Sequence, residues 1–211
     1  MHLALLGDST LDNGAYTSGG PAVIDHLSRL LPEEGRATLL AVDGATTQGI
    51  GSQLDRLPEG ATRAVLSVGG NDAVMEIPVL EEPVGHVSEA LTELSRAVER
   101  FEDAYRRCLK EVLQARLPTT VCTIYNGAFD EPGGQQRVID AALTMWNDVI
   151  LQAALDHECP VIDLRRVCTS RDDYTQQIEP SEQGGRKIAK ALFRAAFEPE
   201  SSSTRIGPTG T

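Results

Sequence analysis

The chain has 211 residues, of which 41% are hydrophobic and 24% charged, enough to bury a substantial core in one domain. Its formal net charge is −12, and no basic run is present to pair with a phosphate backbone, so nucleic acid and anionic membrane surfaces are excluded as expected partners. The acidic residues are scattered, which indicates a solvated surface rather than a cation site.

The N-terminal apolar run is too short for a signal peptide and has no basic region before it. No other run approaches the roughly 18 apolar residues of a membrane span, so we expect a cytoplasmic protein. The four cysteines match no Cys-x-x-Cys pattern, and we expect them to be reduced, mostly buried thiols. They are Cys108, Cys122, Cys159 and Cys168.

Five short apolar runs predict β-strands, and helical patterns lie between them. Each run is nearly continuously hydrophobic, as strands buried on both faces are. The alternation is typical of an α/β fold with a parallel sheet covered by helices on both faces. The predicted strands are His2–Leu6, Ala37–Val42, Ala64–Val68, Thr119–Tyr125 and Pro160–Leu164.

Four helices are predicted from apolar residues spaced three and four apart. The second is unusually long, which leaves room for a break or kink within it, and the fourth opens at Ser181 as N-cap. The polar stretch that follows cannot bury enough apolar surface to become ordered. We therefore expect one domain over residues 1–198 and a flexible tail over residues 199–211. The helices are Pro21–Leu31, His86–Arg116, Gln135–His157 and Ser181–Phe197.

Polar residues follow three strands at their carboxyl ends, where open parallel sheets bind ligands. Gly7-Asp8-Ser9-Thr10 follows the first and offers a serine hydroxyl as a nucleophile. Gly44, after the second, lets a backbone N–H approach a ligand, and Asn71, after the third, offers a neutral amide donor. Each stretch alone is equally compatible with an ordinary polar turn.

Together, these three blocks resemble the SGNH hydrolases, also called the GDSL esterase and lipase family. Gly7-Asp8-Ser9-Thr10 is similar to the nucleophile block, Gly44 to the glycine of the second block, and Gly70-Asn71-Asp72 to part of the third. The resemblance extends over most of residues 2–197 and includes the closing stretch IEPSEQGGRKIAKAL.

The resemblance implies a three-layer α/β/α flavodoxin-like sandwich with a five-stranded parallel sheet. It also implies ester hydrolysis through an acyl-serine, with Ser9 as nucleophile. The backbone amides of Ser9 and Gly44 and the side chain of Asn71 would form the oxyanion hole, with Asp8 and Asp72 as supporting neighbours. The resemblance implies neither a metal nor an organic cofactor.

One block departs from the family pattern. Its Asp-x-x-His falls on Gln176 and Glu179, so both expected residues are absent. Glu179 either accepts the serine proton as a general base, or anchors backbone N–H groups at the helix entrance, or does neither. A carboxylate base starts about 2 pKa units below histidine, or about 3 kcal/mol. Burial or the nearby Asp172 and Asp173 would reduce this deficit.

Among the histidines, only His86 is expected in a loop that can reach Ser9. His2 and His157 are expected at the opposite edge of the sheet, and His26 on the first helix as an exposed or capping residue. Thr10, Met75 and the Ile77–Val84 loop are expected to shape the pocket.

We therefore expect an SGNH-type serine hydrolase that cleaves a small ester, with Glu179 in place of histidine. The alternative is a catalytically impaired relative that binds an acyl or carboxylate ligand without turning it over. A nucleotide binder is disfavoured, because no Gly-x-Gly-x-x-Gly or Walker-type loop is present. The acyl group, the alcohol and the oligomeric state are left open.

Overall fold

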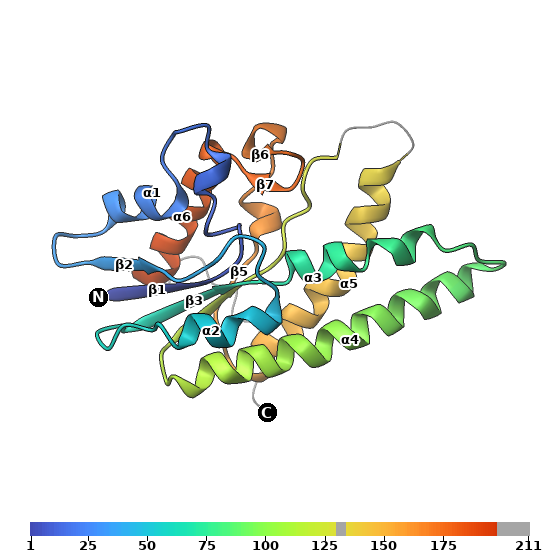
Figure 1. Ribbon diagram of the computed structural model, residues 1–211, viewed down its shortest axis with the longest axis horizontal. Coiled ribbons are helices and arrows are strands. Elements are labelled where there is room, and N and C mark those ends of the chain that lie inside the picture. Colours follow the sequence, from blue (N-terminus) through green and yellow to red (C-terminus); the bar gives the residue numbers. More distant parts are fainter. Residues whose placement is uncertain (130–133, 198–211) are drawn as a thin grey trace, which may run out of the picture.

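A five-stranded parallel sheet forms the middle layer of the computed structural model, which describes residues 1–129 and 134–197 (Figure 1). The strand order is β2-β1-β3-β4-β5, the doubly wound order of flavodoxin-like folds. The predicted sheet is confirmed. Its strands are β1 (His2–Gly7), β2 (Arg36–Leu39), β3 (Arg63–Ser67), β4 (Thr119–Cys122) and β5 (Val161–Ile162).

Strand β1 explains why the strands read as continuous apolar runs. Leu3 and Leu5 belong to the core on one face of the sheet, whereas Ala4 and Leu6 belong to the core on the other. Alternate side chains of a strand point to opposite faces. Because both faces are covered, both sets are apolar.

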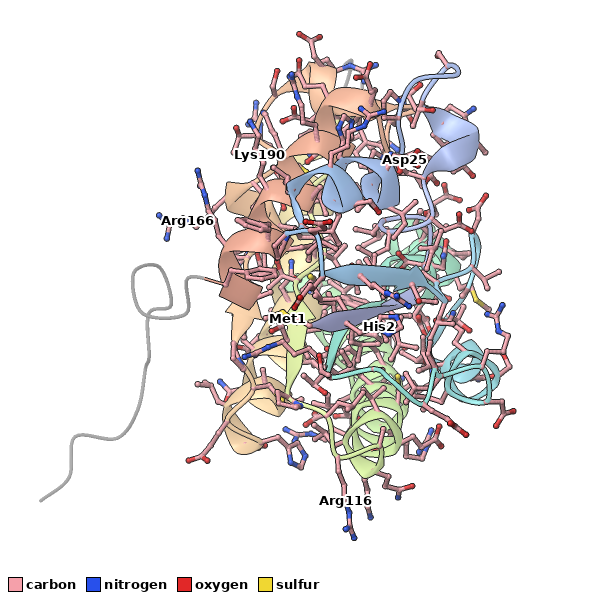
Figure 2. The ribbon with its side chains drawn as sticks, turned by 90° about the vertical axis from the view of Figure 1, so that its left-hand side faces the viewer. Met1, His2, Asp25, Arg116, Arg166 and Lys190 are labelled. Atoms are coloured by element: carbon pink, nitrogen blue, oxygen red, sulfur yellow. The ribbon has the colours of Figure 1, made fainter. Side chains whose placement is uncertain are left out.

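Helices cover the two faces of the sheet, and Figure 2 shows them above and below the strands. Helices α1 and α6 pack on one face, and α2, α4 and α5 on the other. Their bounds are α1 (Val23–Leu30), α2 (Ile50–Leu54), α3 (Gly70–Met75), α4 (Val87–Gln114), α5 (Gln135–Asp156) and α6 (Glu182–Phe197). The four predicted helices correspond to α1, α4, α5 and α6.

Helix α4 runs unbroken from Val87 to Gln114, so the break considered for the second predicted helix does not occur. Its buried residues Ala97, Phe101 and Tyr105 recur every four positions, and a single apolar stripe of this kind lets one straight helix pack along the sheet. The first turns extend past the sheet (Figure 1) and leave Val87 and Leu91 exposed.

Short elements escaped prediction because periodicity needs longer windows. Besides α2 and α3, these include a two-stranded antiparallel hairpin of β6 (Tyr174–Thr175) and β7 (Glu179–Pro180). Glu179 therefore lies on a strand rather than in a loop. The remaining elements are the 3₁₀ helices η1 (Gly14–Tyr16), η2 (Thr47–Gly49), η3 (Ile77–Glu81), η4 (Leu164–Arg166) and η5 (Arg171–Asp173).

Two further predictions meet different outcomes. Ser181 caps α6 as predicted, because its hydroxyl oxygen accepts a hydrogen bond from the N–H of Gly184 (3.2 Å). The predicted tail at 199–211 lies outside the described residues, and the domain boundary stays a prediction. All four cysteines are free, and three of them are buried.

Helix α5 is long and apolar enough to cross a membrane by length and composition alone. Its side chains Trp146 and Ile150, however, are buried in the core between the sheet and α4. A core helix of a globular protein passes the same length and composition test, and we assign α5 to the core.

Candidate active site

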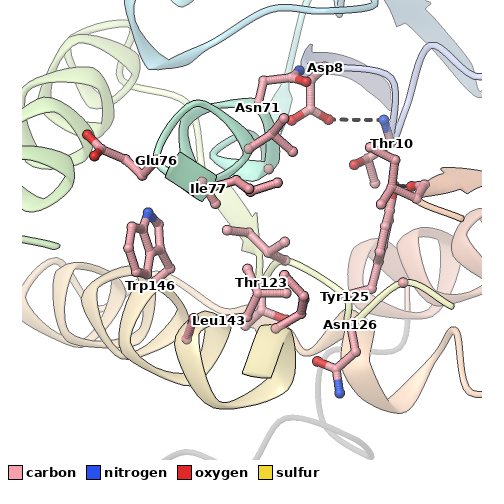
Figure 3. A pocket seen from close by; sticks show the side chains of 18 of the residues that line it. Asp8, Thr10, Asn71, Glu76, Ile77, Thr123, Tyr125, Asn126, Leu143 and Trp146 are labelled. Carbon is pink, nitrogen blue, oxygen red and sulfur yellow. Dashed lines mark hydrogen bonds between the residues drawn. The ribbon is translucent and has the colours of Figure 1, made fainter. Parts of the chain in front are cut away.

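The carboxyl ends of β1, β2 and β3 bring Ser9, Gly44 and Asn71 to the same edge of the sheet. This is the point in the strand order where successive connections lead to opposite sides of β1, and open α/β sheets bind their ligands there. Ser9 is 7% exposed and lines a cavity that also contains Asn71 (Figure 3).

Gly7 fixes the approach to Ser9. Its φ of +146° and its contact with β3 both require glycine, because a Cβ at this position would overlap the carbonyl oxygen of Ser67. The buried Gln53 of α2 holds both backbone groups of Gly7, accepting from its N–H (2.8 Å) and donating to its carbonyl oxygen (2.7 Å). The turn that presents Ser9 is thus anchored to two neighbouring elements.

The loops after β2 and β3 are tied together by two side chains. Asp72 accepts hydrogen bonds from the N–H (3.1 Å) and the hydroxyl (2.7 Å) of Thr47, and the Asn71 amide donates to the carbonyl oxygen of Ala45 (2.9 Å). Asn71 keeps a second N–H for a ligand. Within the described residues, the backbone N–H groups of Ser9 and Gly44 donate to no protein acceptor.

Glu179 lines the same cavity as Ser9, although 170 positions separate them in the chain. Tyr125 anchors the hairpin that carries Glu179, because its hydroxyl donates a hydrogen bond to the carbonyl oxygen of Ile178 (2.6 Å). Gln176, where the aspartate of the family's Asp-x-x-His block was expected to be replaced, lies exposed in the hairpin turn with a left-handed φ of +48°.

The pKa of Glu179 lies above its usual value. Burial is the largest cause and Asp43 adds to it by charge repulsion, whereas a hydrogen bond with the Ser9 side chain acts in the opposite direction. The Oε2 atom of Glu179 is buried and has no hydrogen-bond partner among the described residues. The carboxylate is therefore more basic than an ordinary glutamate.

Asp172 and Asp173 do not raise the pKa of Glu179, contrary to the sequence-based expectation. Asp173 is fully buried and accepts from Lys187 Nζ (2.6 Å) and from Gln183 Nε2 (3.0 Å). Burial by itself would raise the pKa of Asp173, but these hydrogen bonds outweigh it and the net pKa is lowered. Asp172 is exposed, so neither carboxylate acts on the cavity.

The histidines lie away from Ser9. His86 is exposed at the N-cap of α4 and does not line the cavity. His26 was expected to be exposed or capping, but its side chain is only 10% exposed beside Glu182 of α6. No Lys, Arg or His occurs among the described residues that line the cavity.

Asp8, which follows β1, is buried in the wall of the cavity. It is 3% exposed, and its Oδ1 accepts from the N–H of Thr10 (3.0 Å). Burial raises the pKa of Asp8 to about 7 against the opposing hydrogen bonds from Thr10, and the charges of Glu179 and Asp72 add smaller contributions that raise it.

The cavity itself is long and largely apolar. Its volume, measured as the space open to the centre of a water molecule, is about 90 Å³. Figure 3 shows Asp8 and Thr10 at one end and Trp146 at the other. The apolar wall comes from α3, η3, α4 and α5 and includes Ala73, Ile77, Leu80, Leu94, Ile139 and Leu143. Met75, expected in the wall, is instead 72% exposed.

Three residues that shape the cavity or the charge at Glu179 were not predicted from the sequence. Tyr125 follows β4 and Asp43 directly precedes Gly44, so the rule that pointed to strand ends also covers them. Trp146 carried no such signal, because a tryptophan on the inner stripe of a helix is ordinarily a core residue.

Within residues 1–129 and 134–197, no three His, Cys, Asp or Glu side chains gather as a metal site.

The fold and the residues at these strand ends define the class, an α/β sandwich of the SGNH hydrolase type. The chain belongs to the GDSL-like Lipase/Acylhydrolase family, which it matches over residues 5–187. The members of that class are esterases and lipases.

Solved structures share the fold at low sequence identity. An extracellular lipase from Streptomyces rimosus is 19% identical, with a TM-score of 0.64 over 91% of this chain and 98% of its own. A phospholipase A1 from Streptomyces albidoflavus is 17% identical, with a TM-score of 0.66 over 92% and 98%. An acetylxylan esterase from Geobacillus stearothermophilus is 16% identical, with a TM-score of 0.65 over 92% of each chain. No curated protein matches this chain.

Proposed function

We propose that this protein is a serine esterase in which Ser9 attacks an ester and Glu179 is the general base. The observation that carries the proposal is the placement of a partly buried carboxylate with a raised pKa beside the serine, in a cavity without histidine. The raised pKa makes the difference in basicity between Glu179 and a histidine base smaller.

The reaction proceeds in two steps. Glu179 accepts the proton of the Ser9 hydroxyl while Oγ attacks the ester carbonyl carbon, and the carbonyl electron pair moves onto oxygen. The N–H groups of Ser9 and Gly44 and the Asn71 amide stabilise that oxyanion. When the tetrahedral intermediate collapses, Glu179 returns the proton to the leaving alcohol. Water, activated in the same way, then releases the acid from the acyl-serine.

The wall of the cavity favours an aliphatic acyl group. Apolar side chains of α3, η3 and α5 extend from Ser9 toward Trp146, and burying each methylene contributes about 0.8 kcal/mol. We therefore infer that the acyl chain is longer than acetyl.

Labelling with a fluorophosphonate tests the nucleophile, with Ser9→Ala as the unlabelled control. Hydrolysis of p-nitrophenyl butyrate and octanoate from pH 5 to 9 tests the base. We expect Glu179→Gln to lower kcat/KM by at least a hundredfold at every pH, because the amide cannot accept the proton. A matched variant, Asp172→Asn, removes an exposed carboxylate of the same region and should leave the rate unchanged.

The alternative remains a relative that has kept the pocket and lost the chemistry. Absence of labelling and of hydrolysis in the folded protein, together with acyl or carboxylate binding that Ser9→Ala does not change, would establish it. If Glu179→Gln retains the full rate, the base lies elsewhere, and His86→Ala becomes the next variant. Cytoplasmic localisation and a small ester as sole partner remain expectations.

A further inference from the structure

A second carboxyl group, that of Asp8, shares the cavity with Glu179 and Ser9. Within residues 1–129 and 134–197, its hydrogen bonds come from Thr10, through the backbone N–H to Oδ1 and through the side chain. Its Oδ2 faces Gly70, where an added Cβ would lie 3.8 Å away. Gly70 directly precedes Asn71, and both residues line the cavity together with Asp8.

Among the described residues, no cation lines the cavity beside this pair of carboxyls. The third acid among these lining residues is Glu76, which is already paired with Arg100 (2.6 Å). Two carboxyls in one buried site without a cation do not both ionise readily, so one retains its proton. Asp8 is the more deeply buried of the two and is the one expected to stay neutral.

The groups that face Asp8 come from several elements. Glu179 of β7 and Asp72 of α3 are acidic, while Cys122 at the end of β4 and Tyr125, which follows that strand, stay neutral because burial raises their pKa values. The acidic neighbours therefore disfavour the ionised form of Asp8, and the neutral neighbours carry no charge that would stabilise it.

We propose that Asp8 acts in its protonated form as a further catalytic residue that donates a hydrogen bond to the acyl oxygen of the bound ester. The proposal rests on the proposed function. An O–H aimed at the developing oxyanion stabilises it in a site from which water is excluded. An ionised Asp8 opposes the same charge.

The proton of Asp8 stays on Asp8 throughout. Glu179 removes the Ser9 proton, the Oγ–C bond forms and the carbonyl electron pair moves to the oxygen that Asp8 contacts. On collapse this pair returns, the bond to the alcohol breaks, and Glu179 protonates the leaving oxygen. Turnover thus needs Glu179 ionised and Asp8 neutral at once, which predicts activity that fades above about pH 7.

The experiment is the pH profile of kcat/KM for p-nitrophenyl octanoate in the wild type, Asp8→Asn and Asp8→Ala. In the wild type we expect kcat/KM to fall about tenfold per pH unit on the alkaline side. An asparagine side chain donates a hydrogen bond at every pH. At pH 6 the kcat/KM of Asp8→Asn should therefore be lower than that of the wild type, and from pH 6 to 9 it should vary by less than about threefold. Asp8→Ala should lose about a hundredfold at pH 6, the usual effect of removing one oxyanion donor. Asp55→Asn, exposed at the end of α2, controls for net charge.

An alkaline limb that persists in Asp8→Asn would overturn the proposal, as would a wild-type rate that rises to pH 9. Complete loss of activity in Asp8→Asn, with Ser9 unlabelled but the protein folded by circular dichroism, would instead make Asp8 the base and also overturn it. Failure of Ser9 to be labelled in the wild type contradicts the proposed function itself. The two failures are therefore distinguishable.

Discussion

Single residues set the chemistry of this cavity through burial and charge. Glu179 lines the cavity of Ser9, and its basicity depends mainly on burial and secondarily on Asp43. Asp43 is exposed and already accepts a hydrogen bond from the Tyr16 hydroxyl (2.8 Å). Its influence on Glu179 passes partly through water and is correspondingly screened.

Asp43→Asn tests this influence. Removing the charge should lower the pKa of Glu179, so the acidic limb of kcat/KM moves to lower pH by a few tenths of a unit. Tyr16→Phe keeps the Asp43 charge and should leave the limb in place. An acidic limb that does not move in Asp43→Asn, measured at low ionic strength, would show that burial alone sets the basicity.

At the level of elements, Glu179 is positioned by a short hairpin fastened to α6. The buried Asp173 receives Lys187 and Gln183 of α6 as well as the N–H groups of Thr169 and Ser170. Two-stranded hairpins are marginal by themselves, so these contacts, together with the Tyr125 hydroxyl, hold β7 beside Ser9.

Asp173→Ala should therefore destabilise the fold by about 3 kcal/mol, because it leaves the partly exposed Lys187 and two partly buried N–H groups without their acceptor. The neighbouring Asp172→Ala removes an exposed side chain and should change the free energy of unfolding by less than about 0.5 kcal/mol. Urea unfolding at pH 7 measures both. The lowered pKa of Asp173 means that its contribution is present at neutral pH and is lost as the pH falls through that value. Equal stabilities of the two variants would contradict the structural role.

For the molecule as a whole, the cavity arises where the loops beyond the sheet meet α3, α4 and α5. Trp146 closes one end and packs against Phe101 of α4, with ring centroids 6.3 Å apart. Because Trp146 is 3% exposed, its indole defines the depth available to an acyl chain.

Trp146→Ala should deepen the cavity and shift the preference toward longer chains. We expect the ratio of kcat/KM for dodecanoate over hexanoate esters to rise about tenfold, while stability falls by about 3–5 kcal/mol. Trp146→Phe, which keeps a ring, should change the ratio less. Initial rates at 15 °C keep the weakened variant folded. An unchanged ratio in a folded Trp146→Ala variant would place the acyl chain elsewhere.

Much of the fold was predictable because its signals are local. Continuous apolar runs marked all five strands, and spacings of three and four marked α1, α4, α5 and α6. The hairpin was not predictable, since two-residue strands leave no periodicity. Asp172 and Asp173 are close to Glu179 in the chain, yet they lie in η5 before the hairpin, and their side chains have surroundings different from those of Glu179.

The sequence alone determined the parallel sheet and the likeness to the SGNH hydrolases, because these depend on residue order and periodicity. Only the tertiary structure decided that Glu179 enters the cavity of Ser9, that Asp8 is buried there with no cation among the described lining residues, and that Trp146 closes the far end. Burial and charge act between residues that are far apart in the chain, so their effects on pKa and on pocket depth arise only once the chain is folded.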